Sequence, residues 1–85
     1  MVRVVVPSML AAQANGQQHF DVEVDTVGEA LRVLPVADLV LDERGELRRY
    51  LNVYVDGMDA RDSGGLECSL AGRRQVRIVA MLSGG

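Results

Sequence analysis

Two glycines at the carboxyl end of the chain, Gly84 and Gly85, form the pattern with the clearest chemical meaning. They follow RIVAML, an apolar stretch that is typical of a strand. Because glycine has no Cβ, such an end can pass through a narrow channel, and its terminal carboxylate is unhindered. The pattern predicts a tail, residues 81–85, whose carboxylate reacts inside the active site of another protein.

Outside the Gly-Gly end, the side chains that could react or bind a metal are scattered along the chain. His19 is the single histidine, and the alternation around it predicts a solvated position on the polar face of a strand. Cys68 has no neighbouring His or Lys to activate it and is interpreted as a small, semi-buried thiol. Asp56, Asp59 and Asp62 lack the spacing of a calcium loop and are interpreted as a solvated loop. We therefore expect no enzyme activity, no metal and no bound cofactor.

Four segments read as strands because they are β-branched or alternate between apolar and polar residues. They are residues 2–7, 19–24, 50–57 and 74–82. The Asn15-Gly16 pair between the first two predicts an antiparallel hairpin. The segment 58–70 is expected to be a connection, with a possible helical turn at 66–70.

One main helix is predicted after the hairpin. Thr26 and Glu29 have the spacing of a capping box, which makes Thr26 the expected N-cap. Pro35 discourages the helix from continuing beyond Leu34, although residues 36–41 could add a short helical turn. The apolar face of this helix is expected to contain Val27, Ala30, Leu31 and Leu34.

The order of these elements predicts an α+β roll, in which one main helix packs across a mixed sheet. The last strand can lie beside the first only in parallel, because a helix-containing crossover separates them. We expect a single domain over residues 1–80, followed by the tail.

Composition narrows the class of protein further. Hydrophobic residues make up 48% of the chain but aromatic residues only 4%, so the core should be aliphatic. A net charge of −3 argues against nucleic acid as a partner. No segment is apolar enough to span a membrane, and Pro7 interrupts the apolar run that a secretory signal would need. A cytoplasmic protein is expected.

The segment RRYLNVYVDGMDARDSGGLECSL, residues 48–70, together with the Gly-Gly end, resembles the MoaD/ThiS family of sulfur carrier proteins. The resemblance covers essentially the whole chain, and it is strongest to the CysO-like branch that serves cysteine synthesis. It implies the β-grasp, or ubiquitin-like, fold.

The resemblance also implies a mechanism. An adenylating enzyme of the ubiquitin-activating type would use ATP to activate the carboxylate of Gly85. A sulfur donor would then convert it to a thiocarboxylate, and a sulfur-accepting synthase would receive the sulfur. Gly84, Ser83, Leu82 and Met81 would contact these partners, beside the exposed face of the sheet. Met81 could equally belong to the core.

Other functions remain open at this stage. The same end would suit the small subunit of molybdopterin synthase or a sulfur carrier for a secondary metabolite. It would also suit a ubiquitin-like modifier that is joined to lysines of other proteins. Finally, the chain could be a simple β-grasp interaction domain in which the two glycines are incidental.

Overall fold

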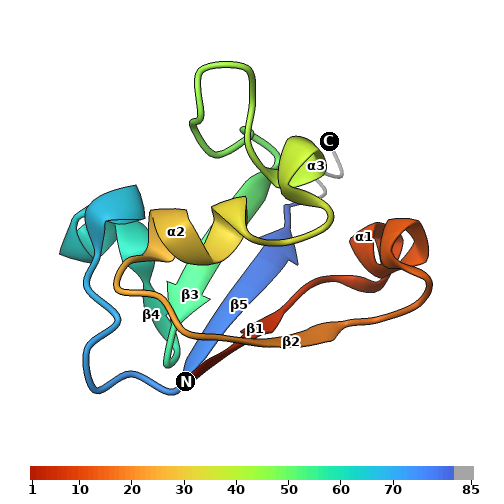
Figure 1. The fold of residues 1–85 in the computed structure, drawn as a ribbon. Coiled ribbons are helices and arrows are strands. Elements are labelled where there is room, and N and C mark those ends of the chain that lie inside the picture. The colour runs from red at the N-terminus through yellow and green to blue at the C-terminus, as the bar shows by residue number, and fades with distance from the viewer. Residues whose placement is uncertain (82–85) are drawn as a thin grey trace.

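The computed structural model describes residues 1–81, which form a five-stranded mixed sheet with the strand order β2-β1-β5-β3-β4 (Figure 1). β1 pairs with β2 in antiparallel and with β5 in parallel orientation, and β3 is antiparallel to β5 and β4. The mixed sheet, the opening hairpin and the parallel pairing of the first and last strands are confirmed. The strands are β1 (Val2–Val5), β2 (His19–Val22), β3 (Leu51–Val55), β4 (Met58–Asp59) and β5 (Gln75–Ala80).

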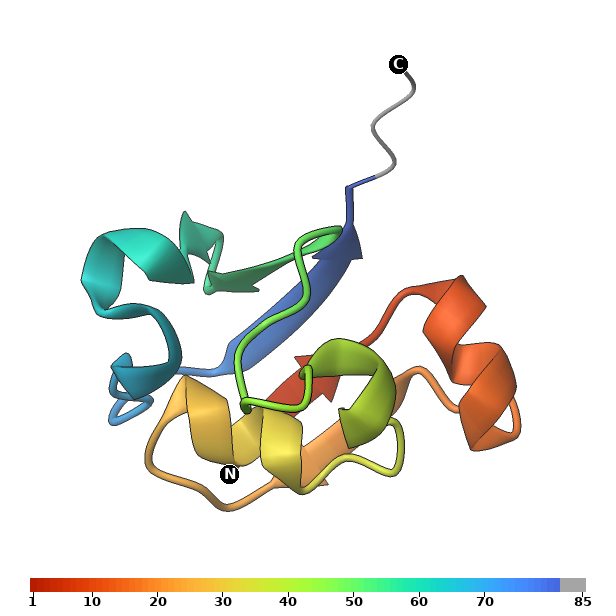
Figure 2. The same ribbon diagram turned by 90° about the horizontal axis from the view of Figure 1, so that it is seen from above.

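Helices α2 and α3 pack against one face of the sheet, and α1 lies apart from them beyond β1 and β2 (Figures 1 and 2). Within residues 1–81 no helix is long and apolar enough to cross a bilayer. The α-helices are α1 (Ser8–Ala11), α2 (Val27–Arg32) and α3 (Ala37–Val40). The 3-10 helices are η1 (Ala12–Ala14), η2 (Ala60–Ser63) and η3 (Gly65–Glu67).

The predicted cap of the main helix is confirmed. Thr26 has extended backbone angles, and its Oγ1 accepts a hydrogen bond from the backbone N–H of Glu29 at 3.2 Å. The reciprocal half of the capping box takes another form, since the Thr26 hydroxyl donates to the Glu29 carboxylate at 3.3 Å. This local contact fixes the start of α2.

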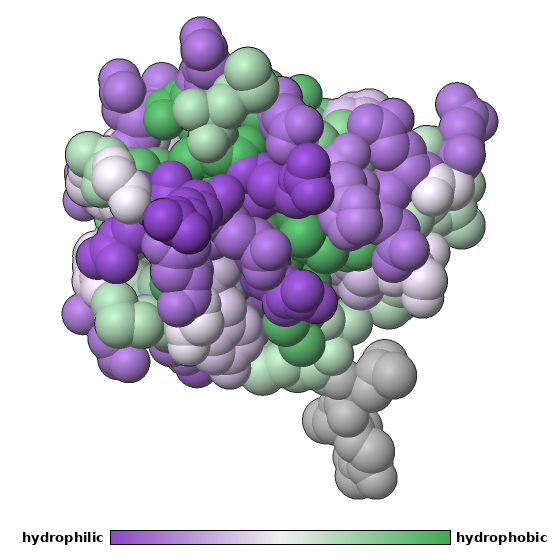
Figure 3. Space-filling view, turned by 90° about the horizontal axis from the view of Figure 1, so that it is seen from below, coloured by the Kyte–Doolittle hydropathy of each residue, from purple (hydrophilic) through white to green (hydrophobic). Residues whose placement is uncertain are grey.

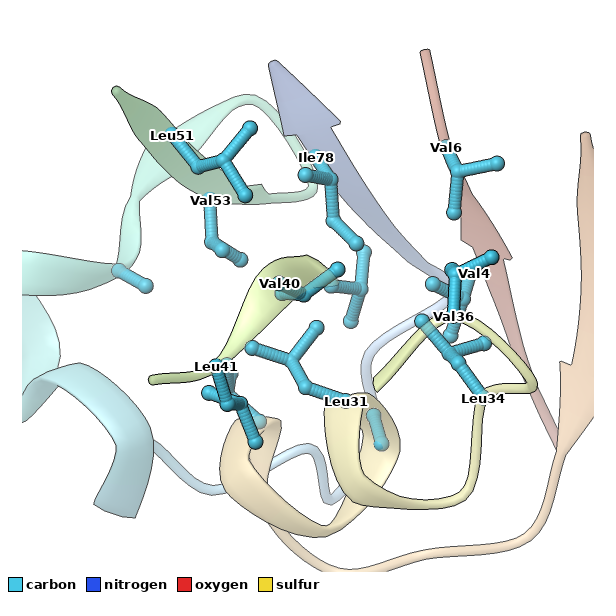
Figure 4. Packing of buried hydrophobic residues seen from close by; sticks show 14 of the residues in the cluster. Val4, Val6, Leu31, Leu34, Val36, Val40, Leu41, Leu51, Val53 and Ile78 are labelled. Atoms are coloured by element: carbon cyan, nitrogen blue, oxygen red, sulfur yellow. The ribbon is translucent and has the colours of Figure 1, made fainter. Parts of the chain in front are cut away.

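The core between the helices and the sheet is aliphatic, as the composition predicts. Val4 from β1, Leu31 from α2 and Val76 from β5 are completely inaccessible to solvent. Figure 4 shows Leu31 between side chains from β1, β3, β5 and α3. Phe20 is only partly buried at the edge of this cluster.

The connection between β1 and β2 differs from the prediction. Residues 8–14 form α1 and η1, where the Asn15-Gly16 signal predicted no helical turn. Asn15 and Gly16 have φ angles of 56° and 85°, and they end η1 instead of closing a two-residue hairpin. Burial of Leu10, Ala11 and Ala14 explains the helical turns, because these residues cover part of the core.

The connection after β3 also differs. Asp56 and Gly57, with φ angles of 49° and 85°, form a two-residue turn that reverses the chain, so that Met58 pairs with Val55. The segment from Met58 to Asp59 is therefore strand β4, whereas residues 58–70 were expected to be a connection.

Truncation of the central core residue tests this packing. Leu31→Ala should lower the free energy of unfolding by roughly 2–5 kcal/mol, since it leaves a cavity between the helix and the sheet. Chemical denaturation would measure the loss. Val33→Ala is the matched control, because Val33 is 57% exposed on the neighbouring turn and should change stability by less than about 0.5 kcal/mol. Equal losses in the two variants would contradict this description of the core.

Candidate functional site

The candidate site is the carboxyl end of β5, which is held by β3 and the residue before it. Ala80 pairs with Leu51 of β3, and the backbone N–H of Met81 donates to the carbonyl of Tyr50 at 2.6 Å. β1 pairs in parallel with the first half of the strand, from Gln75 to Arg77. The backbone is therefore held in place up to Met81, which lies at the surface.

Met81 is the one predicted partner-binding residue that the structure describes. Its side chain is 41% exposed, which places it at the surface and not in the core. The other predicted site residues, Leu82, Ser83, Gly84 and Gly85, lie outside the described residues, and so does most of the tail assigned to 81–85.

The loop that precedes β3 borders the same end of the sheet. The Tyr50 hydroxyl donates to the carbonyl of Leu39 at 3.2 Å, and the Arg48 guanidinium donates to the carbonyl of Asp38 at 2.9 Å. Both acceptors belong to α3. These bonds attach the loop to α3. Because Tyr50 also accepts the hydrogen bond from Met81, residues of α3 and of the loop lie near Met81 although they are distant from it in sequence.

The face seen from below carries mostly polar side chains, with apolar ones in separate places (Figure 3). An ion pair between Arg3 of β1 and Asp21 of β2, with 3.2 Å between guanidinium and carboxylate, joins the two strands. Both side chains are more than half exposed, so this pair contributes little to stability. Docking of a partner on the exposed sheet face near the tail stays a prediction.

Asp59 is part of a hydrogen-bonded network and not of a solvated loop. Its carboxylate accepts from the Arg61 guanidinium at 2.8 Å, from the Arg61 backbone N–H at 2.9 Å and from the Asn52 amide at 3.2 Å. These bonds, with that from the Arg61 guanidinium foremost, hold the pKa of Asp59 far below its usual range. Asn52, which is buried in β3, is thereby satisfied.

Asp56 also has a structural role. Its carboxylate accepts hydrogen bonds from the backbone N–H groups of Arg74 and Gln75, at 3.2 Å and 3.0 Å. The turn after β3 is thus tied to the beginning of β5. Asp56 and Asp62 are exposed, as the interpretation of a solvated loop expects, whereas Asp59 is half-buried in β4 and the interpretation was wrong for it. Within residues 1–81, His, Cys, Asp and Glu side chains nowhere gather into a group that could hold a metal ion.

The two remaining reactive side chains lie in different parts of the fold. His19 is exposed on β2, as predicted. Cys68 follows η3 and is 5% exposed, and its thiol lies 3.6 Å from the carbonyl of Ser69, to which it can donate. Its burial makes this cysteine a packing residue of the core.

Comparisons with known proteins give one consistent result, although no protein-family model matches the chain. The chain is 32% identical over 91 residues to "Sulfur carrier protein CysO" of Mycobacterium tuberculosis and of Mycobacterium bovis, covering 99% of this chain and 98% of theirs. The crystal structure of M. tuberculosis CysO superimposes with a TM-score of 0.83 at 28% identity, over 96% of this chain and 100% of that one.

Two further structures are similar. A chain in the BexX/CysO complex of Amycolatopsis orientalis gives a TM-score of 0.84 at 30% identity, with both chains covered completely. SAMP1 of Haloferax volcanii gives 0.73 at 27% identity, over 99% of this chain and 98% of that one.

Acid titration tests the network around Asp59. Because the pKa of Asp59 is lowered on folding, its contribution to stability is complete above the unfolded-state pKa near 4 and is lost as the pH falls through the lower folded-state value. Asp59→Asn removes this linkage. We expect its stability, measured by urea denaturation between pH 6 and pH 2, to fall less steeply in acid than that of the wild type.

Asp62→Asn is the control, since it removes one exposed carboxylate from η2, the 3-10 helix that Asp59 caps. Identical acid profiles for the wild type and Asp59→Asn would refute the role given to this network.

Proposed function

This chain belongs to the CysO family of sulfur carrier proteins, which share its β-grasp fold, and we propose that it carries sulfur as a thiocarboxylate at Gly85. The observation that supports this most is the 32% identity over 99% of the chain. The matched proteins are named as carriers and not as catalysts. The chain would then act as a co-substrate of other enzymes.

The proposed chemistry needs an activating enzyme because a carboxylate is a poor electrophile. An adenylating enzyme of the ubiquitin-activating type would join the Gly85 carboxylate to the α-phosphorus of ATP and release pyrophosphate. Sulfide released by a sulfur donor would then attack the acyl carbon, and AMP would leave. The resulting thiocarboxylate is a strong nucleophile, and a partner that encloses it protects it from water. ATP is bound and consumed by the activating enzyme in this scheme.

The protein's own contribution is positional. The pairing of β5 with β3 up to Ala80 holds the base from which the tail would extend, and the two glycines would let the tail enter a narrow active site. A synthase would accept the sulfur, and we propose cysteine as its product because the matched carriers are CysO proteins. The BexX/CysO complex supports stable binding of such a carrier to a second protein. We propose the cytoplasm as the location, because activation consumes ATP.

Exchange of labelled pyrophosphate into ATP tests the first step. With the adenylating enzyme of the same organism, the full chain should support exchange, whereas deletion of Gly85 should reduce it at least about a hundredfold, because the shortened carboxylate no longer reaches the α-phosphorus. An interaction domain with incidental glycines would support no exchange, with or without Gly85. Covalent adducts on other proteins that survive thiols would point to a modifier instead.

A second variant tests the role of Met81. Met81→Asp should leave the fold intact, since the side chain is 41% exposed, yet weaken activation about tenfold by placing a charge where the activating enzyme closes on the tail. The apparent KM for the carrier in pyrophosphate exchange would measure this. Met58→Asp is the matched control, because Met58 is 49% exposed but belongs to β4, away from the end of β5. Equal KM values for both variants, or a melted Met81→Asp protein, would exclude the proposed contact.

A further inference from the structure

A groove of about 330 Å³ opens beside the point where the chain leaves β5. Its floor is formed by Leu51 and Val53 of β3, and its sides by Leu47 of the preceding loop and Leu66 of η3. Figure 1 shows the short helices after β4 on one side of β3 and the loop of residues 42–50 above its beginning. The groove therefore lies on the helix-covered side, separate from the exposed face of the sheet.

Apolar groups are accessible in this groove. Leu47 and Leu66 are partly buried against the core, and Met81 at the end of the groove is 41% exposed. Apolar side chains that line a hollow without filling it are typical of a surface that a partner covers.

The charge of the groove is opposite to that of the whole protein. Arg48, Arg49 and Arg61 line it and no Asp or Glu does, although the chain has a net charge of −3. Asp42 and Glu43 line a different hollow with Arg48. One part of an acidic protein thus presents clustered guanidinium groups around an apolar floor.

Two of these arginines are available to an acidic partner. The Arg61 guanidinium is already paired with Asp59 at 2.8 Å. Arg48 is positioned by the neutral carbonyl of Asp38, and within residues 1–81 the ion pairs join only Arg3 to Asp21 and Arg61 to Asp59. Neither Arg48 nor Arg49 therefore forms an ion pair with a carboxylate of the described residues, although Arg48 lies near enough to Asp42 to contribute to lowering the pKa of that carboxyl.

We propose that this groove binds a segment of a partner protein in which an apolar side chain lies between Asp or Glu residues. The apolar side chain would occupy the space between Leu47 and Leu66, and the carboxylates would pair with Arg48 and Arg49. Charge complementarity of this kind selects partners and speeds their encounter, while the apolar anchor supplies most of the affinity. The proposal does not depend on sulfur chemistry at Gly85. Met81 lines the groove. The bound segment would therefore lie next to the protein that binds the tail.

Titration of the isotopically labelled full chain, followed by NMR, tests the proposal. The probes are a short synthetic peptide with leucines between Glu and Asp residues, and its counterpart with Gln and Asn in their place. The acidic peptide should shift the amide signals of residues 47–53, 60–66 and 81. The neutral peptide should bind at least about tenfold more weakly, and added salt should reduce the difference.

Charge-reversal variants locate the site. The double variant Arg48→Glu/Arg49→Glu should abolish binding of the acidic peptide. Arg49→Glu alone, which leaves the contact of Arg48 with Asp38 in place, should weaken binding severalfold and guards against a folding defect in the double variant. Arg73→Glu/Arg74→Glu is the matched control, since it makes the same charge change in the exposed loop before β5 and should retain binding.

Several results would overturn the proposal. These are absence of binding by the acidic peptide, equal binding of the neutral one, equal damage by the control pair, or signal changes away from the groove. If the same signals shift with protein concentration alone, the groove binds a second copy of the chain and the proposed occupant is wrong.

Discussion

Backbone hydrogen bonds to the β3 side of β5 fix the place where the chain leaves the sheet. β3 pairs with this strand in antiparallel orientation from Val76 to Ala80, whereas β1 pairs in parallel with its first half, from Gln75 to Arg77. A parallel neighbour requires a long crossover, which here includes the main helix and buries its apolar face on the sheet. The arrangement places the last described residue, Met81, against Tyr50 at the surface. For the proposed function such a rigid base would be useful, because the tail would then begin from the same position in every encounter with a partner.

Much of this architecture could be predicted from the sequence because its determinants are local. Alternation identified the four longer strands, and Thr26 with Glu29 identified the start of α2. Strand β4 has only two residues, which is too short for an alternation of apolar and polar residues to be recognised. It forms because the turn at Asp56 returns the chain to β3. The helical turns after β1 were missed because the Asn-Gly signal favoured a simple hairpin.

The candidate site was less predictable, because its contacts join distant residues. Asp56 finds its partners at Arg74 and Gln75, 18 and 19 positions away, which no local pattern indicates. The arginine-lined groove likewise combines four separate segments, which are Val27, residues 47–53, residues 60–66 and Met81. The two glycines could be recognised from the sequence, because their chemistry belongs to the backbone and needs no tertiary partner. Side chains of the described residues thus supply position and charge, while the proposed reaction takes place on the terminal carboxylate.

The most direct test of this account is the intact mass of the protein, expressed in its own host together with its activating enzyme. The account predicts a population whose mass is greater by the replacement of one oxygen with sulfur, located at Gly85 by fragmentation and absent when that glycine is deleted. An unmodified mass in the presence of ATP, a sulfur source and a competent activating enzyme would contradict it.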